Sequence, residues 1–254
     1  APGEHKLAIE AIDKLTGPEW YNLFKNLHAG LLLDLAGQRR DATKRFERAY
    51  ELDRSQLRIV QAYGSHLARQ GNREEALKVY RAFDELLPHH PLITDAIGDL
   101  GAGKRLPSLA DSPQAGAAEV LYGLGAAIGR RGSEDLGLIY LQLALYLAPS
   151  HTMALLSLAD FYEGVKKYDL AIKVYDRVPA NSPLRRSAQV QRAMDLDALD
   201  RTAEATAQLE KLIADKPSDL EAISALGNIQ RGRKQFGECG EVYSKGIDTI
   251  ARPE

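Results

Sequence analysis

The sequence predicts an all-α solenoid of antiparallel helix pairs that is interrupted once by a half-repeat. Three observations support this fold class. Equivalent small, aromatic and proline residues recur every 34 positions, the apolar residues between them have helical spacing, and one interval is shorter than a repeat. Each helix pair can bury its apolar face only against its neighbours, so the pairs must stack. We expect a single solenoid over residues 1–254.

The repeated residues explain how two helices of one unit pack. A small residue at the eighth position and another at the twentieth let the two helices approach closely, and an aromatic residue at the twenty-fourth fills the gap to the next unit. Pro88 ends its unit because proline cannot donate a backbone N–H. The first matching pairs are Gly30 and Gly64, Ala42 and Ala76, and Phe46 and Tyr80.

This register assigns almost every residue to a repeat. The predicted repeats are 23–56, 57–90, 118–151, 152–185, 186–219 and a weaker 220–253, with residues 1–22 as part of a preceding repeat. The interval between starts 57 and 118 is 61 residues, or 34 plus 27, so residues 91–117 form a half-repeat.

The half-repeat can hold only one helix. Residues 91–100 have a helical apolar face, but glycines and prolines between Gly101 and Gly116 prevent a second helix. We expect an extended connection there, with Leu106 and Leu109 packing where the second helix would have been, and we expect the connection to cover the apolar helix of residues 136–148.

The pattern resembles the tetratricopeptide repeat family over nearly the whole chain. The resemblance implies a right-handed stack whose first helices line a concave groove that binds a peptide or a partner helix. The stretches 116–125 and 138–149 further resemble long bacterial, especially alphaproteobacterial, tetratricopeptide proteins of the cell envelope. That likeness implies an adaptor in envelope protein assembly or protease recruitment. An envelope or periplasmic location is favoured, and the cytoplasm stays open.

Composition and motifs exclude several other functions. Lys and Arg number 33 against 35 Asp and Glu, so no basic stripe predicts nucleic-acid binding. No stretch approaches the roughly 18 apolar residues of a membrane span. The single cysteine cannot form an internal disulfide, and the six histidines are scattered without metal-ligand spacing. No nucleophile is placed beside a histidine and an acid, so we expect no enzyme, metal or cofactor.

One motif imitates a phosphate-binding loop. Gly98–Arg105 matches the spacing G-x-x-x-x-G-K, but Arg105 replaces the Ser or Thr that would hold magnesium. The stretch also ends a predicted helix, whereas a phosphate loop must open one. Nucleotide binding is therefore a remote alternative, and a helix C-terminus is the expected structure.

The remaining functional candidates lie on the predicted groove wall. Arg58 and Arg69 are eleven residues apart and share one helical face, and Arg130 occupies the repeat position of Arg69. We expect a protein or peptide partner with carboxylates there, because Arg pairs them bidentately, and we expect neither Arg58 nor Arg69 to take part in packing. The full set of predicted groove residues is Arg58, Gln61, Ser65, Arg69, Tyr122, Arg130, Met153, Leu156, Asp160, Glu163, Met194, Asp197, Ser224, Asn228 and Arg231.

Two classes of function stay open. The first is a non-enzymatic scaffold or adaptor that uses the groove. The second is a structural component that forms homo-oligomers through the apolar helix 136–148, whose residues are apolar on nearly all sides.

Overall fold

The computed structural model describes residues 4–129 and 134–250 of the chain. Those residues form fourteen α-helices and no strand, which confirms the all-α fold class. The chain divides into two compact units, Ala1–Leu121 and Tyr122–Glu254. None of the helices within the described ranges is long and apolar enough to cross a membrane.

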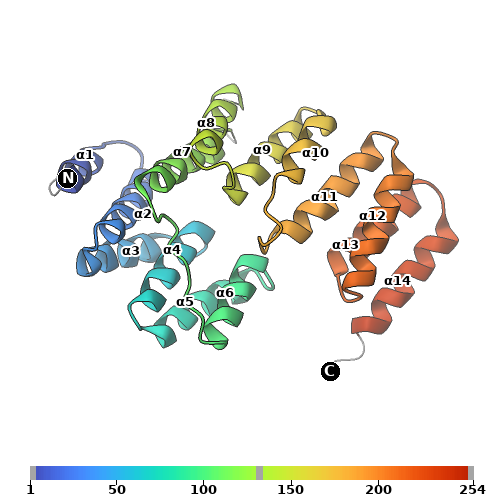
Figure 1. Cartoon of the computed structure of the whole chain (residues 1–254), viewed down its shortest axis with the longest axis horizontal. Coiled ribbons are helices and arrows are strands. Elements are labelled where there is room, and N and C mark those ends of the chain that lie inside the picture. Colours follow the sequence, from blue (N-terminus) through green and yellow to red (C-terminus); the bar gives the residue numbers. More distant parts are fainter. Residues whose placement is uncertain (1–3, 130–133, 251–254) are drawn as a thin grey trace. The chain divides into compact units, whose positions relative to one another are not determined.

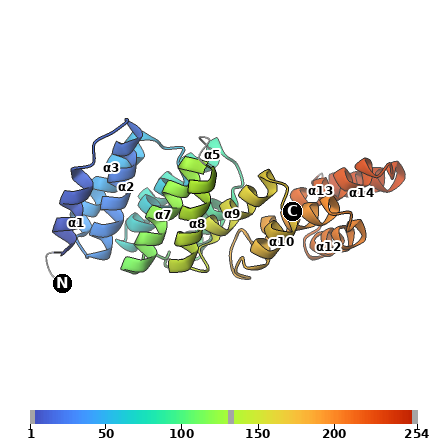
Figure 2. The same cartoon turned by 90° about the horizontal axis from the view of Figure 1, so that it is seen from above.

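The first unit is built from consecutive antiparallel helices. Helix α2 packs on α3, α4 packs on α5, and α5 packs on α6. Figure 1 shows these helices in the blue to green part of the chain, and Figure 2 shows α2 beside α3. The helices of this unit are α1 (Glu4–Asp13), α2 (Trp20–Leu35), α3 (Arg39–Leu52), α4 (Leu57–Arg69), α5 (Arg73–Leu86), α6 (Pro91–Gly101) and the first half of α7 (Pro113–Gly129).

Glycines at the eighth repeat position allow the helices of a pair to touch. A Cβ added at Gly64 would lie 2.5 Å from Cζ of Tyr80, and one added at Gly30 would lie 2.6 Å from Cε1 of Phe46. At Gly98, one repeat further along, an added Cβ meets nothing within 4 Å. The contact is missing there because α6 has no second helix of its own pair.

The connection between α6 and α7 replaces that missing helix. Residues 104–112 form no helix; Pro107 lies among them, and Gly103 directly precedes them. The extended segment is shorter than the expected range 101–116, because α7 already begins at Pro113. Leu106 is buried in a cluster with residues of α4, α5 and α6, and Ala110 is buried in a cluster with residues of α2, α3 and α4. Figure 1 shows the connection passing α4 on its way to α7.

The expectation that this connection covers the helix of residues 136–148 is therefore wrong. Its two buried side chains, Leu106 and Ala110, pack on helices of the first unit. Helix α6 directly precedes the connection and belongs to the cluster that buries Leu106, so burying this side chain there requires no long excursion of the chain.

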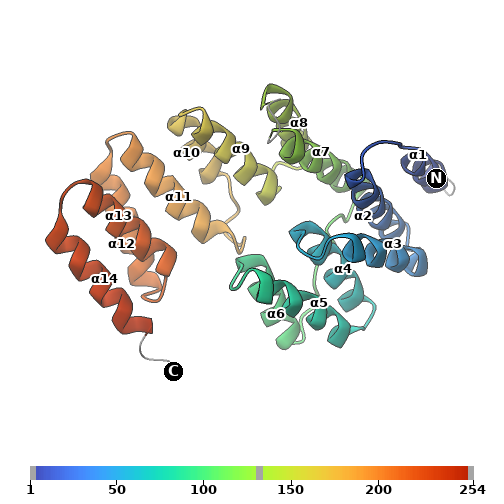
Figure 3. The same ribbon diagram turned by 180° about the vertical axis from the view of Figure 1, so that it is seen from behind.

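The second unit repeats the same packing. Helices α9 and α10, α11 and α12, and α13 and α14 pack pairwise, and Figure 3 shows the last four of them from behind. An apolar cluster that includes Leu196, Leu209 and Leu226 joins α11, α12 and α13. The helices are the second half of α7, α8 (Glu134–Leu147), α9 (Thr152–Gly164), α10 (Tyr168–Asp176), α11 (Arg185–Ala198), α12 (Thr202–Asp215), α13 (Leu220–Gly232) and α14 (Phe236–Ile250).

The turns inside the pairs keep the 34-residue register. Lys166, Asp200 and Lys234 lie at successive intervals of 34 and have φ angles of 57°, 59° and 63°. Each is a left-handed residue that follows the first helix of its pair, the place where a helix commonly ends in this conformation. The one cysteine, Cys239, is buried at a helix contact and donates its Sγ hydrogen to the carbonyl of Gly227.

Candidate protein interface

In the first unit, Arg58 of α4 is paired with a carboxylate of the same chain. Its guanidinium contacts Glu119 of α7 with two nitrogens, Nη2 to Oε1 and Nε to Oε2 at 3.2 Å. The Arg58 side chain is 19% exposed and that of Glu119 is 6% exposed. Arg58 also donates to Oε1 of Gln61 at 2.8 Å. The sequence analysis expects Arg58 to bind a carboxylate of a partner. In the structure the carboxylate beside Arg58 belongs to α7 of the same chain.

Arg69 belongs to a second internal network. It pairs with Asp34 of α2, which also accepts from Nδ1 of His66 at 2.9 Å and from the hydroxyl of Ser108 at 3.3 Å. Burial raises the pKa of Asp34, but the hydrogen bonds from His66 and Arg69 outweigh it and hold that pKa below its usual range. Ser65 donates its hydroxyl to the carbonyl of Pro107.

The expectation that Arg58 and Arg69 take no part in packing is wrong. Both are bound to buried carboxylates, and Ser65 and Gln61 of the same helix are engaged with neighbouring groups. Residues 107–119 supply two of these partners, Pro107 and Glu119, and Ser108 donates to Asp34, the partner of Arg69. The predicted groove residues of α4 therefore face the chain's own connection and the start of α7.

In the second unit, Glu163 faces two groups of neighbouring helices. Its Oε1 accepts from the hydroxyl of Tyr175 at 2.6 Å, and its carboxyl group also meets that of Asp195 on α11. Asp195 is only 3% exposed. Burial, together with the charge of Glu163 and a hydrogen bond to it, raises the pKa of Asp195 to about 7. A proton on Asp195 relieves the repulsion between the two carboxyl groups.

The other predicted groove residues of this unit are distributed over separate contacts. Asp197 accepts from Arg233 and from Thr202, and Asn228 accepts from Arg231. The Tyr122 ring lies 5.0 Å from that of His151. Asp160 and Ser224 are exposed, Met153, Leu156 and Met194 are half-buried, and Arg130 lies outside the described residues.

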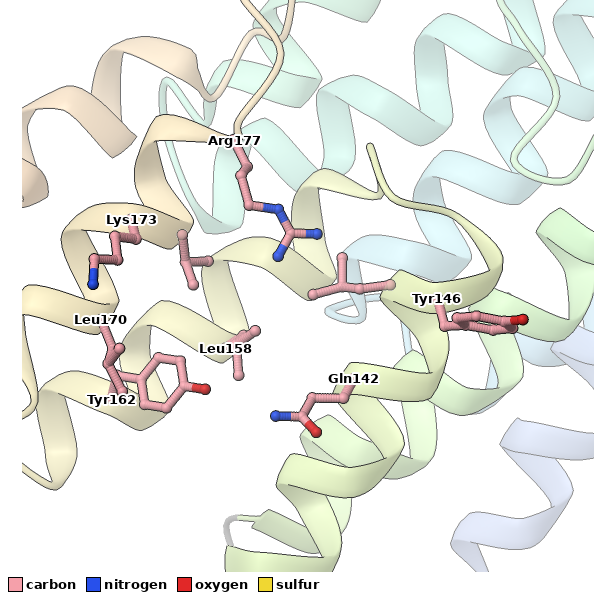
Figure 4. A pocket seen from close by; sticks show the side chains of 9 residues that line it. Gln142, Tyr146, Leu158, Tyr162, Leu170, Lys173 and Arg177 are labelled. Carbon is pink, nitrogen blue, oxygen red and sulfur yellow. The ribbon is translucent and has the colours of Figure 1, made fainter.

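A groove that the sequence reasoning missed lies between α8, α9 and α10. Its volume is about 390 Å³. Figure 4 shows Gln142 and Tyr162 pointing toward each other across it, with Leu158 on its floor and Arg177 reaching in from the end of α10. We call it the α8–α10 groove; its lining residues are Gln142, Leu145, Tyr146, Leu158, Tyr162, Leu170, Lys173, Val174 and Arg177.

The α8–α10 groove carries two cations without an acidic partner. Lys173 and Arg177 make no ion pair in the part of the chain that the structure describes, whereas Arg58 and Arg69 are each paired internally. Both cations stand beside apolar and aromatic side chains of α9 and α10. The groove can therefore bind a group that is apolar on one side and anionic on the other.

Helix α8 also has an outward apolar face, which we call the α8 stripe. Its residues are Leu136, Ile139, Leu143 and Tyr146, with exposed fractions of 44%, 52%, 45% and 82%. Leu141 and Leu145, on the opposite side, are buried. Helix α7 covers that side, since a Cβ added at Gly125 would lie 3.0 Å from Cγ of Leu141, and α9 packs beside it. The all-round apolar composition of this helix was the sequence signal for the stripe.

The remaining chemical candidates have ordinary structural roles. In Gly98–Arg105 the N–H groups of Ala102, Gly103 and Lys104 donate to carbonyls of α6, so they are not free to bind a phosphate. The Lys104 ammonium lies 2.7 Å from the carboxylate of Asp99. Across residues 4–129 and 134–250, no group of three or more His, Cys, Asp or Glu side chains is arranged to hold a metal ion.

Comparison with known proteins gives structural likeness alone. No protein-family model matches the sequence, and no curated protein matches it. Solved structures of MamA are similar. The structure "MamA 41-end from Desulfovibrio magneticus RS-1" is 18% identical, with 80% of this chain and 98% of that chain covered and a TM-score of 0.45. The structure "MamA MSR-1 C2" is 21% identical, with 76% of this chain and 98% of that chain covered and a TM-score of 0.44. Identities and TM-scores this low assign no function to this chain.

Proposed function

We propose that this protein is a non-enzymatic scaffold that binds a segment of another protein in the α8–α10 groove. The observation that carries the proposal is the pair of unpartnered cations, Lys173 and Arg177, at the edge of an apolar and aromatic floor. Tyr and Arg are enriched where protein partners bind most strongly. The segment would place apolar side chains over Leu158 and Tyr162 and a carboxylate against Arg177, which can bind it with two hydrogen bonds.

The repeated architecture supports this kind of function. Stacked helix pairs expose long continuous surfaces whose side chains vary independently of the packing positions. The predicted groove residues of α4 are committed to internal contacts, so the unpaired cations of α10 are the better place for an acidic partner. On the resemblance of residues 116–125 and 138–149, we place this scaffold in the bacterial cell envelope, as an adaptor in protein assembly or protease recruitment.

Affinity capture with paired charge reversals tests the proposal. The tagged chain is incubated with an extract of its native cells, and retained proteins are identified by mass spectrometry. The variant Lys173→Glu/Arg177→Glu should lose a protein that the parent retains. The control Lys211→Glu/Lys245→Glu makes the same charge change at two exposed positions of the second unit outside the groove.

The control variant should retain the same protein as the parent. Equal retention by all three forms would show that the α8–α10 groove is not the binding surface. Loss by both variants would show that binding depends on net charge alone. Fractionation of native cells tests the compartment, and recovery only with cytosolic proteins would contradict the envelope placement.

A further inference from the structure

The α8 stripe has the spacing of a helix that packs against another helix. Leu136, Ile139, Leu143 and Tyr146 are separated by three, four and three residues. This is the a and d pattern of a coiled-coil seam, which lines up apolar side chains about every 3.5 residues. All four are exposed, so the seam has no partner among the described helices of the second unit.

Charged groups stand at opposite ends of the stripe. Asp135 is exposed in the first turn of α8, at the N-terminal end of the stripe. Arg177 reaches into the α8–α10 groove, whose α8 wall is formed by Gln142, Leu145 and Tyr146 in the C-terminal half of that helix (Figure 4). Among the described residues, a carboxylate thus stands at the N-terminal end of the stripe, and a guanidinium stands beside the C-terminal half of α8.

We infer that the α8 stripe binds the α8 stripe of a second copy of this chain, with the two helices antiparallel. This inference rests on the proposed function, because it assumes that the surface beside the α8–α10 groove binds protein. It adds that the bound protein is a second copy of this chain. A two-fold axis perpendicular to both helices would pass near the middle of the stripe. Each copy's Leu136 would then lie opposite the other's Tyr146, and its Ile139 opposite the other's Leu143.

The same two-fold operation brings opposite charges together. An antiparallel partner places its Asp135 beside the C-terminal half of α8, where Arg177 stands, and the symmetry repeats this contact at the other end. On a helical wheel, Asp135 lies on the side of the stripe that also carries Gln142, a groove residue. A parallel arrangement would instead set Asp135 against Asp135 and Arg177 against Arg177, which like-charge repulsion disfavours.

The chemistry of the stripe also selects a helix as its occupant. The backbone hydrogen bonds of α8 are satisfied within the helix, so no free edge exists for an added strand. Recognition must come from side chains that interdigitate, as they do between two helices. A contact limited to one helix of each copy is small, so we expect a weak dimer that depends on protein concentration.

Sedimentation analysis of the purified chain over a range of concentrations tests the inference. The parent should change from monomer to dimer. The variant Ile139→Ser/Leu143→Ser should raise the dimer dissociation constant by at least about tenfold. Both residues are exposed, so its melting temperature should stay within a few degrees of the parent's. If the first variant folds poorly, a second variant, Tyr146→Ser, removes a different apolar side chain of the stripe and should also weaken the dimer.

Reciprocal charge reversal tests the antiparallel geometry. Asp135→Arg alone and Arg177→Asp alone should each weaken the dimer. Both substitutions in one chain should restore it, because Arg at position 135 of each copy then meets Asp at position 177 of the other. Lys211→Glu serves as the control and should leave dimerisation unchanged.

Three results would overturn the inference: a monomer at every concentration, a dimer that persists in the seam variants, or a failure of the combined reversal to restore association. A strictly monomeric chain that still captures a partner through Lys173 and Arg177 would leave the proposed function standing. A dimer with no captured partner would support the inference and contradict the groove as a site for other proteins.

Discussion

The α-carbon of Gly64 lies against the aromatic ring of Tyr80, sixteen residues later, and a Cβ at Gly64 would stand 2.5 Å from Cζ of that ring. A real Cβ does not approach an atom so closely, so the buried ring or the helix would have to move. Tyr80 is almost fully buried and has little room to do so.

Gly64→Ala should therefore destabilise the protein by about 1–3 kcal/mol, the usual cost of overpacking a core. Gly98→Ala is a matched control, since Gly98 occupies the same repeat position in α6 and an added Cβ meets nothing within 4 Å. That control should be neutral or stabilising by about 0.5–1 kcal/mol, because alanine favours a helix more than glycine does. Urea unfolding measures both values, and equal effects would show that the Tyr80 contact does not govern this position.

These two glycines also show why the fold was predictable. The contact between Gly64 and Tyr80 is local, so it recurs wherever the 34-residue register is kept, and the register can be found in the sequence alone. The packing of Leu106 and Leu109 in place of the missing helix was predictable from the register, whereas the expected cover of residues 136–148 was not a consequence of it, because an apolar side chain can bury against any uncovered apolar surface. Only the packed chain shows that α2, α4 and α6 provide it.

The ion pair of Arg58 and Glu119 leads to a prediction opposite to that from the sequence. Replacing Arg58 alone, as in Arg58→Met, leaves the buried Glu119 carboxylate without its guanidinium partner and should cost about 3–5 kcal/mol. The double variant Arg58→Met/Glu119→Leu removes both charges and should be clearly more stable than the single one. Denaturant unfolding of both variants gives the comparison, and a double variant no more stable than Arg58→Met would argue against a strong coupling between the two side chains.

The same pair marks the limit of sequence reasoning about the site. Helical periodicity predicts that Arg58 and Arg69 share one face of α4, and both make internal contacts from it. The partner of Arg58 is 61 residues away, beyond the segment that breaks the register, and no repeat position predicts which acid will reach it. The cations of the α8–α10 groove were missed for a related reason, since Lys173 and Arg177 become notable only once it is seen that neither makes an ion pair among the described residues.

The turn residue Lys166 predicts a stabilising substitution. With a φ of 57°, its side chain is held in the left-handed region, where a Cβ crowds the backbone and glycine does not. Lys166→Gly should raise the free energy of unfolding by about 0.5–1 kcal/mol. Lys167→Gly is the control, because Lys167 has a φ of −93° and should gain nothing. The melting temperatures of the two variants should differ by several degrees. Similar melting temperatures would mean that the left-handed conformation of Lys166 does not destabilise the folded chain.

The buried pair of Glu163 and Asp195 predicts an unusual dependence of stability on pH. In the folded chain, burial and the neighbouring Glu163 raise the pKa of Asp195 to about 7, whereas an aspartate in the unfolded chain titrates near 3.9. Between these values the folded state holds a proton that the unfolded state does not. The contribution of Asp195 to the free energy of unfolding is therefore most favourable at low pH and is lost as the pH rises through about 7.

Asp195→Asn should remove this dependence, because asparagine stays neutral and its amide can donate to Glu163. At pH 8 the variant should be more stable than the parent by ~1 kcal/mol or more, and the difference should shrink as the pH falls toward 5. Glu210→Gln, on the exposed side of α12, controls for the loss of one negative charge. Urea unfolding at pH 5 and pH 8 supplies the measurement. If Asp195→Asn were less stable than the parent at pH 8, Asp195 would be an ionised group with a favourable partner, and the raised pKa of Asp195 would be contradicted.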